Sequence, residues 1–190
     1  MKKLFDGFGS DKSLAHDYHI PYGQLFGLVP LGAILEIGIG SVNPEYPGNM
    51  GSRGHPGASQ AAFRDSGFFT HVFGADIDRS ILTNSPGITN FFVDQTDAGS
   101  LTNLRNEPFG TEISLIIDDG LHQAEANLRT LEHLFPLLRS RGYYVIEDLS
   151  GEEFHKVLSA VGRERKYHNF SIWLNRGRFV ECHLVVIQKD

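Results

Sequence analysis

The sequence has a single cysteine, Cys182, and no long apolar run. One thiol cannot form a disulfide within the chain, which fits a reducing compartment. No stretch approaches the ~20 apolar residues that a membrane-spanning helix needs. The basic start Met1-Lys2-Lys3 is followed by Asp6 and Asp11, without the apolar region of a secretory signal. These absences predict a cytoplasmic protein.

The sequence also lacks an excess of basic residues. Its 17 Lys and Arg are outnumbered by 23 Asp and Glu, the net charge is −6, and no run of Lys or Arg interrupts this balance. Binding to nucleic acid or to an anionic membrane surface is therefore not expected. A length of 190 residues, 41% of them hydrophobic, predicts one domain over residues 1–190 with a full core.

Apolar runs and helical periodicities alternate along the chain. We expect about five strands alternating with helices and then two antiparallel strands, because the turn signal 175–178 separates the last two apolar runs. Pro136 should kink or restart the end of the long helix. The expected strands are 33–40, 70–75, 90–93, 113–117, 143–146, 169–174 and 179–187, and the expected helices are 21–29, 58–65, 100–106, 123–138 and 153–161.

Two segments are predicted to be irregular, an N-terminal arm within residues 1–30 and the loop Ser41–Gly57. The loop holds three prolines and four glycines and is longer than a compact fold requires, which is typical of a lid or a binding loop. The start of the arm either lines a pocket or lies exposed. The polar residues of these segments that could face a bound molecule are Lys12, His16, Tyr18, Arg53 and His55.

Acidic pairs follow both strands of a βαβ unit that spans residues 113–149. Asp118-Asp119 follows the first strand, and Glu147-Asp148 follows the second. Parallel strands end at the same edge of a sheet, so the four carboxylates should converge, with His122 one helical turn inside. Their repulsion would be offset by a hard divalent metal ion. The alternative is an ordinary turn, because Asp at a helix N-terminus is also favourable.

A glycine-containing turn follows the first expected strand, in Glu36-Ile37-Gly38-Ile39-Gly40. Its glycines would let the backbone pass close to a ligand, although Asn43 replaces the third glycine of the dinucleotide fingerprint. Asp76 ends the next strand, where a carboxylate can accept both hydroxyls of a ribose. Asp94-Gln95 ends the third and could face an adenine. A plain βα turn and solvated capping residues are the alternatives.

Several of these motifs resemble those of a known family. Leu35–Gly40, the acidic residue after the second strand and the closing hairpin are similar to class I S-adenosylmethionine-dependent methyltransferases. Gly9–Lys12, Ile117–His122 and Val145–Asp148 narrow the resemblance to the metal-dependent sugar O-methyltransferases of macrolide biosynthesis, the mycinamicin and macrocin type. The resemblance implies a Rossmann-like α/β fold. Its mostly parallel seven-stranded sheet would have a C-terminal antiparallel hairpin and helices on both faces.

The resemblance also implies an activity and roles for single residues. The activity is methylation of a hydroxyl on a sugar or glycosylated small molecule, and a homo-oligomer is compatible with it. His122 would be the base, acting with Asp119, and Mg²⁺ or Mn²⁺ would be held by Asp119, Glu147 and Asp148. Asp118 would border the donor, and it would either be a metal ligand or orient one. The other residues implied to bind S-adenosylmethionine are Glu36, Gly38, Gly40, Ser59, Asp76, Asp94 and Gln95.

Elementary chemistry agrees with these roles. A sugar hydroxyl is a poor nucleophile, and a divalent ion lowers its pKa and fixes its oxygen in line with a methyl group. A histidine with a pKa near neutrality can take the proton.

Other classes of protein remain open on the sequence. An iron-dependent hydroxylase of the cephalosporin hydroxylase type needs a second histidine, and none stands at a strand end in the cluster. A nicotinamide enzyme would have an acidic residue ~20 residues after the glycines, and the distance from Gly38 to Asp76 is much longer. A non-catalytic module would bind the donor without a metal, and a methyltransferase could act on another small-molecule acceptor.

Overall fold

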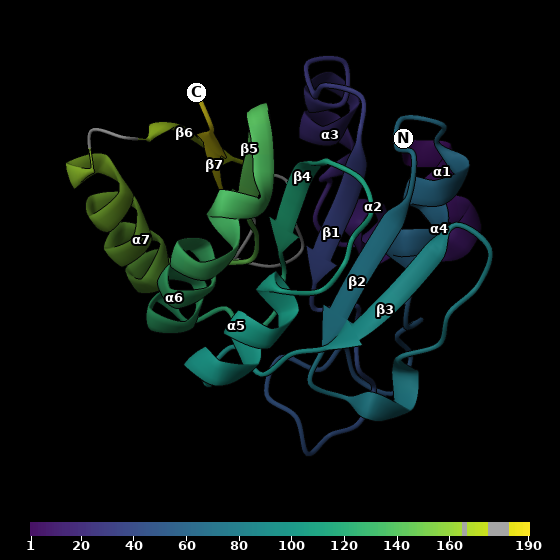
Figure 1. The fold of residues 1–190 in the computed structure, drawn as a ribbon. Coiled ribbons are helices and arrows are strands. Elements are labelled where there is room, and N and C mark those ends of the chain that lie inside the picture. The colour runs from purple at the N-terminus through teal and green to yellow at the C-terminus, as the bar shows by residue number, and fades with distance from the viewer. Residues whose placement is uncertain (165–166, 175–182) are drawn as a thin grey trace.

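The computed structural model describes residues 1–164, 167–174 and 183–190. It forms a seven-stranded sheet in the order β3-β2-β1-β4-β5-β7-β6 (Figure 1). The strands are β1 (Ala33–Ile37), β2 (Val72–Asp76), β3 (Ile88–Phe92), β4 (Ile113–Asp118), β5 (Leu138–Ile146), β6 (His168–Trp173) and β7 (His183–Gln188).

The first five strands are parallel, and β7 runs antiparallel to both of its neighbours, β5 and β6. Every residue of β1, β2 and β4 is buried, because helices cover both faces of a parallel sheet. The predicted α/β fold, mostly parallel with an antiparallel C-terminal pair, is therefore confirmed. The predicted turn 175–178 and residues 179–182 lie outside the described part of the chain.

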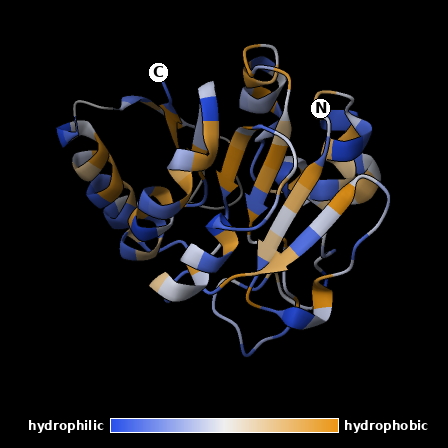
Figure 2. Ribbon diagram, in the orientation of Figure 1, coloured by the Kyte–Doolittle hydropathy of each residue, from blue (hydrophilic) through white to orange (hydrophobic). Residues whose placement is uncertain are grey.

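Helices cover the two faces of the sheet in two groups (Figure 1). Side chains alternate along a strand, so Leu35 packs towards α5–α7 while Ile34 packs towards α1, α3 and α4. Figure 2 shows the central strands as mostly hydrophobic. The helices are α1 (Lys2–Phe8), α2 (Asp11–Leu14), α3 (His19–Leu25), α4 (Ala58–Asp65), α5 (Ala98–Arg105), α6 (Ala124–Leu134) and α7 (Gly151–Arg163), with short 3₁₀ turns at Arg79–Ile81 and Phe135–Leu137.

The proline in the long helix acts as predicted. The α-helix ends at Leu134, and Pro136 lies in a 3₁₀ turn, since proline has no backbone N–H to continue the ladder. Gly142 and the three residues before it, which separate the predicted helix 123–138 from the predicted strand 143–146, do not form a connecting turn, because β5 already begins at Leu138. The pairing with β4 shifts there and Arg141 has φ 63°, so a strand irregularity gives the same glycine signal as a turn.

The N-terminal segment is more ordered than predicted. Residues 2–8 and 11–14 are helical, and Phe5 and Tyr18 are fully buried in the core beside α4. The exposed-arm alternative is therefore wrong for this segment, whose helices are too short to give a readable periodicity. None of the described helices combines the length and apolar character that a bilayer crossing requires.

The glycine turn after β1 is shaped by close backbone contact. Gly38 has φ +81°, and a Cβ atom added there would lie 2.2 Å from the backbone oxygen of Asp119. A side chain at position 38 would thus push away the turn that follows β4.

We expect Gly38→Ala to lower the free energy of unfolding by about 3 kcal/mol, through the clash and the left-handed backbone. Urea unfolding followed by circular dichroism would measure it. Gly162→Ala is the matched control, because that helical glycine has nothing within 4 Å, and it should stabilise the protein by up to about 1 kcal/mol. Equal stability of the Gly38→Ala and Gly162→Ala variants would contradict the close backbone contact described at position 38.

Candidate functional site

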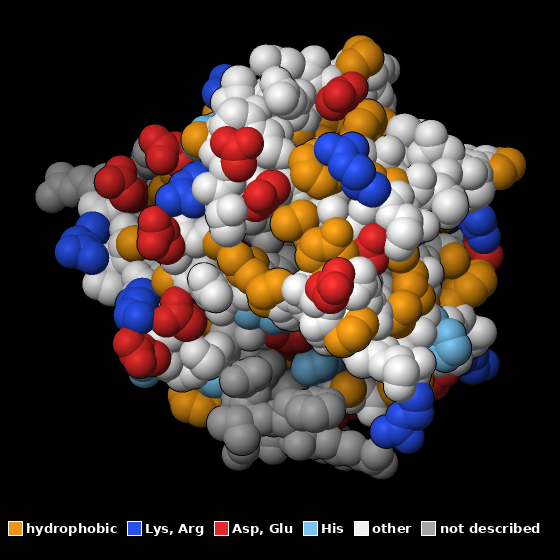
Figure 3. Space-filling model, turned by 90° about the horizontal axis from the view of Figure 1, so that it is seen from below, with side chains coloured by type: hydrophobic (Ala, Val, Ile, Leu, Met, Phe, Trp, Pro, Cys, Tyr) orange, Lys and Arg blue, Asp and Glu red, His pale blue; other side chains and the backbone are white. Residues whose placement is uncertain are grey.

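The carboxyl ends of β1, β2, β4 and β5 surround one cavity of about 760 Å³. Figure 3 views the molecule from this side, and histidine and acidic side chains are visible within its hollowed centre. The predicted site residues that line the cavity are Gly38, Gly40, Ser59, Asp76, Asp94, Gln95, Asp119, His122 and Asp148. Glu36, Asp118 and Glu147 lie behind its wall and are fully buried.

Asp76 stands at one side of the cavity and is tied to the glycine turn. Its carboxylate accepts hydrogen bonds from the backbone N–H of Ile39 and of Asp78, both at 2.9 Å. Burial raises its pKa above the ordinary value. A carboxylate has further lone pairs, so Asp76 can still accept hydrogen bonds from a ligand in the cavity.

The other residues predicted to bind S-adenosylmethionine differ in whether they reach the cavity. Glu36 is buried behind Gly38 and accepts a hydrogen bond from the Ser59 hydroxyl at 2.8 Å. Burial raises the pKa of Glu36 to about 7. Asp94 faces the cavity, but one of its oxygens accepts from the backbone and hydroxyl of Thr96.

Gln95 braces the turn that carries the acidic pair. Its amide nitrogen donates to Asp118 at 2.8 Å and to the Thr130 hydroxyl at 2.9 Å, and its oxygen accepts from the backbone N–H of Leu121 at 2.8 Å. The Tyr144 hydroxyl donates to the other Asp118 oxygen at 3.1 Å. Burial raises the pKa of Asp118 to about 6. Asp118 therefore orients the turn and does not reach the cavity.

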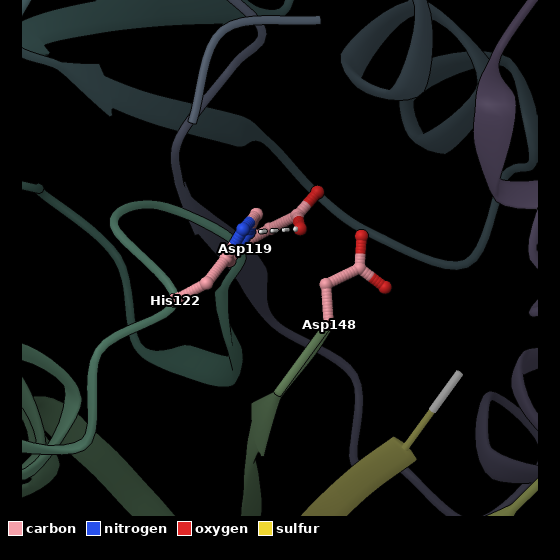
Figure 4. A group of neighbouring side chains, drawn as sticks. All are labelled: Asp119, His122 and Asp148. Carbon is pink, nitrogen blue, oxygen red and sulfur yellow. Dashed lines mark hydrogen bonds and ion pairs between the residues drawn. The ribbon is translucent and has the colours of Figure 1, made fainter. Parts of the chain in front are cut away.

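Asp119, His122 and Asp148 form the group that could hold a metal ion. One ligand atom from each lies within 4.8 Å of the others. Figure 4 shows the carboxylates of Asp119 and Asp148 side by side, with His122 against Asp119. The distance from His122 Nε2 to Asp119 Oδ1 is 3.3 Å. His122 has φ 57°, so the left-handed backbone at this position directs its ring back over the acidic turn.

Lys12 is a site residue whose position the sequence did not reveal. Its ammonium lies 2.7 Å from Asp119 Oδ2, 2.5 Å from Glu147 Oε2 and 3.4 Å from Glu36 Oε1, and the residue is only 2% exposed. Burial opposes its charge, yet the three carboxylates raise the pKa of Lys12 well above its usual value. The available signal was Ser10, which caps α2 and so fixes the start of the helix that carries Lys12.

Aromatic residues of the N-terminal segment contact the second acidic pair. The Tyr22 hydroxyl donates to Glu147, and the Tyr18 hydroxyl donates to Asp148. His16 Nδ1 lies 3.3 Å from the same Asp148 oxygen. The structure therefore places Glu147 against Lys12 and Tyr22, outside the group of candidate ligands, while Asp148 faces the cavity.

The charges of the group depend on each other. Burial opposes ionisation of Asp119, but Lys12 and His122 hold its pKa well below the ordinary value. Burial lowers the pKa of His122, yet the hydrogen bond to Asp119 raises it to about 9. Burial and Asp119 raise the pKa of Asp148 to about 6. Asp119 therefore favours the protonated form of His122.

The donor set of this group fits a divalent cation. Two carboxylates and one imidazole converge from the turn after β4 and the end of β5, and the carboxylate oxygens suit Mg²⁺ or Mn²⁺. An ion beside Asp119 and Asp148 would also relieve the repulsion between them.

The long loop after β1 forms part of the cavity wall. Met50 and Gly48 line the cavity, and a Cβ atom added at Gly48 would meet the Gly120 backbone oxygen at 2.9 Å. His55 borders the cavity, whereas Arg53 is exposed and lies away from its lining. The action of the long loop as a lid stays a prediction.

The three hydrogen bonds of the Gln95 side chain predict that Gln95→Ala strongly lowers the stability of the protein. The change would leave the buried Asp118 carboxylate, the Thr130 hydroxyl and the Leu121 N–H short of partners, so the free energy of unfolding should fall by about 3 kcal/mol. Gln123→Ala is the control, because Gln123 is exposed and its amide makes no capping hydrogen bond at the start of α6, and the change should alter stability by less than about 0.5 kcal/mol. Denaturant unfolding of both variants would test this, and equal effects would contradict the brace.

Comparisons with curated proteins find sugar O-methyltransferases, although no family model matches the chain. It is 38% identical over 122 residues to demethylmacrocin O-methyltransferase of Streptomyces fradiae, covering 61% of the chain and 27% of that protein. It is 32% identical over 143 residues to 8-demethyl-8-alpha-L-rhamnosyl tetracenomycin-C 2′-O-methyltransferase of Streptomyces olivaceus, covering 74% of the chain and 35% of that protein. The chain thus matches about a third or less of each relative's length.

Comparison with solved structures shows the fold. The MycE methyltransferase of mycinamycin biosynthesis, solved with Mg, SAH and mycinamycin VI, superposes with a TM-score of 0.67 and 19% identity, over 99% of this chain and 54% of that one. The resemblance expected from the sequence is confirmed: the chain is similar to the macrolide-type sugar O-methyltransferases and has the fold of a class I S-adenosylmethionine-dependent methyltransferase.

Proposed function

We propose that this protein is an S-adenosylmethionine-dependent, divalent-metal-dependent O-methyltransferase that acts on a hydroxyl of a sugar or glycosylated small molecule. The observation that carries the proposal is that Asp119, His122 and Asp148 share one cavity with Gly38 and Asp76. The relatives support it, because both are named as O-methyltransferases and one name includes a rhamnosyl group. The MycE structure contains Mg and SAH.

Residues at the ends of β1 and β2 would bind the donor. Gly38 and Gly40 line the cavity without side chains, and Asp76 is held by two backbone N–H groups with lone pairs to spare for ribose hydroxyls. S-adenosylmethionine supplies an electrophilic methyl group when it is bound. Glu36 would act from behind the wall, by fixing Ser59 and the turn.

Residues at the ends of β4 and β5 would hold the metal and the acceptor. Asp119 and Asp148 present their oxygens to the cavity, and Glu147, which was expected as a third ligand, would be engaged by Lys12 instead. A divalent ion supplies Lewis-acid chemistry when it is bound, lowering the pKa of a hydroxyl next to it.

His122 would accept the proton of the acceptor hydroxyl. It lies beside Asp119, whose negative charge raises the pKa of the imidazole to about 9 and keeps it protonated. His122 can therefore act as a base only after the charge of Asp119 has been offset, because its pKa then returns towards the ordinary value. Proton transfer to His122 would in this way depend on a cation bound at Asp119.

The hydroxylase alternative is less well supported. A facial triad for iron uses two histidines and one carboxylate. The described residues that converge within 4.8 Å comprise one histidine and two carboxylates. His16 contacts Asp148 but is not part of that group.

Turnover should require the metal, whereas donor binding should not. We expect methylation of a glycoside or catechol panel by the Mg²⁺-loaded protein to fall by at least about 100-fold in EDTA. The affinity for SAH, measured by calorimetry, should change less than about twofold, because the hydrogen bonds that hold Asp76 come from Ile39 and Asp78 and not from the metal group. Added Mg²⁺ or Mn²⁺ should restore turnover, and full activity in EDTA would contradict the metal's role.

Single substitutions should separate the two halves of the cavity. Asp76→Ala is expected to weaken SAH binding about 10-fold to 100-fold through lost charged hydrogen bonds, and to leave Mn²⁺ binding unchanged. Asp119→Ala should weaken Mn²⁺ binding and keep SAH binding. Glu45→Ala, which removes an exposed carboxylate of the long loop, is the control for charge alone. The reverse pattern, measured by calorimetry, would refute the assignment.

A further inference from the structure

Lys12 occupies a position among the carboxylates that the proposed mechanism does not use. Its ammonium contacts Asp119 and Glu147 within 2.7 Å, and Glu36 lies 3.4 Å away. Asp119 is also the residue that contributes an oxygen to the candidate metal group. One carboxylate therefore faces Lys12 with Oδ2 and His122 with Oδ1.

The position of Lys12 is fixed by the fold. The residue lies in α2, behind the Ser10 cap, and its side chain is 2% exposed. The segments on both sides are anchored, since Phe5 and Tyr18 are fully buried. The ammonium is therefore enclosed by the fold beside Asp119 and Glu147.

A fixed cation next to a shared carboxylate has two effects of opposite sign. It holds Asp119 and Glu147 together at an edge where they would otherwise repel each other, and it competes with any other cation for their charge. It also withdraws Glu147 from the ligand group, because Lys12 and Tyr22 take one oxygen each.

We propose that Lys12 is a positioning residue that limits the affinity of this cluster for its divalent ion, while it keeps the carboxylates in place when the ion is absent. The inference rests on the proposed metal-dependent function. It assigns Lys12 a role that packing alone would not give, because its removal should strengthen metal binding. A merely structural lysine would weaken the site when lost.

The test is the dissociation constant for Mn²⁺, measured by calorimetry or electron paramagnetic resonance on the metal-free full chain. We expect Lys12→Met to bind Mn²⁺ at least about tenfold more tightly than the unchanged protein, because a buried positive charge next to the ion is lost. Lys12→Arg should stay near the unchanged protein. Lys2→Met is the matched control, since Lys2 pairs with Asp6 at an exposed position.

The Lys12→Met variant could fail to fold, because three carboxylates lose their cationic partner. A second comparison keeps the inference testable in that case. Lys12→Met combined with Glu147→Gln removes the lysine and one carboxylate together. That double variant should bind Mn²⁺ more tightly than Glu147→Gln alone. Circular dichroism and SAH binding would show that each variant is folded, and SAH is suitable because it lacks the positive sulfonium.

The outcomes separate this inference from the proposed function. Unchanged or weaker Mn²⁺ binding in both comparisons, with SAH binding intact, would overturn the role of Lys12 and leave the methyltransferase proposal standing. Absence of Mn²⁺ binding in the unchanged protein but not in Lys12→Met would support the competition and overturn the metal part of the function. Absence of binding in every variant would overturn both.

Discussion

The contact between the Lys12 ammonium and the buried carboxylates is the interaction on which the site depends. Acidic residues from the ends of three parallel strands meet at one edge of the sheet, and Glu36 and Glu147 are fully buried there. Carboxylates so close together are stable only with a cation, a shared proton or strong donors beside them. Lys12 supplies the cation, and tyrosines of the same N-terminal segment supply donors.

Each acidic pair divides into one inward and one outward member. Asp118 and Glu147 are fully buried and orient the structure, whereas Asp119 and Asp148 reach the cavity. The division arises where the strands end, because Asp119, Glu147 and Asp148 follow the last residues of β4 and β5, and Asp148 has φ 53°. Backbone hydrogen bonds from Asp119 N–H to the oxygen of Ile37, and from Glu147 N–H to that of Asp118, hold the strand ends together. The neighbours Asp118 and Asp119 thus have different surroundings, and their pKa values shift in opposite directions.

The order of the strands explains why one cavity serves both halves of the proposed reaction. The strand order changes direction between β1 and β4, and open α/β sheets bind ligands beyond the strand ends at such a point. Gly38 touches the Asp119 turn directly, so the predicted donor side and the acidic side are in contact. Because this fold hosts many activities, the assignment depends on the acidic group and not on the sheet.

The helices and strands, and the chemistry at their ends, could largely be predicted from the sequence. Buried runs such as Ala33–Ile37 predicted strands, Pro136 predicted the end of a helix, and the residues after the strands predicted an acidic ligand edge. These features are local, since hydrophobic period and turn residues are read within a few positions. The bounds of β5 differed from the prediction, because an irregular strand and a turn share the same signals.

The packing of remote segments sets which groups become partners, and this could not be predicted from the sequence. Lys12 is separated by 107 residues from Asp119 and by 135 from Glu147, and no local pattern in the sequence joins them. Gln95 was predicted at the adenine, and the structure places its amide as a brace between Asp118 and Leu121. The physical reason is that burial and charge pairing are properties of the folded neighbourhood, which the chain acquires when remote segments pack together.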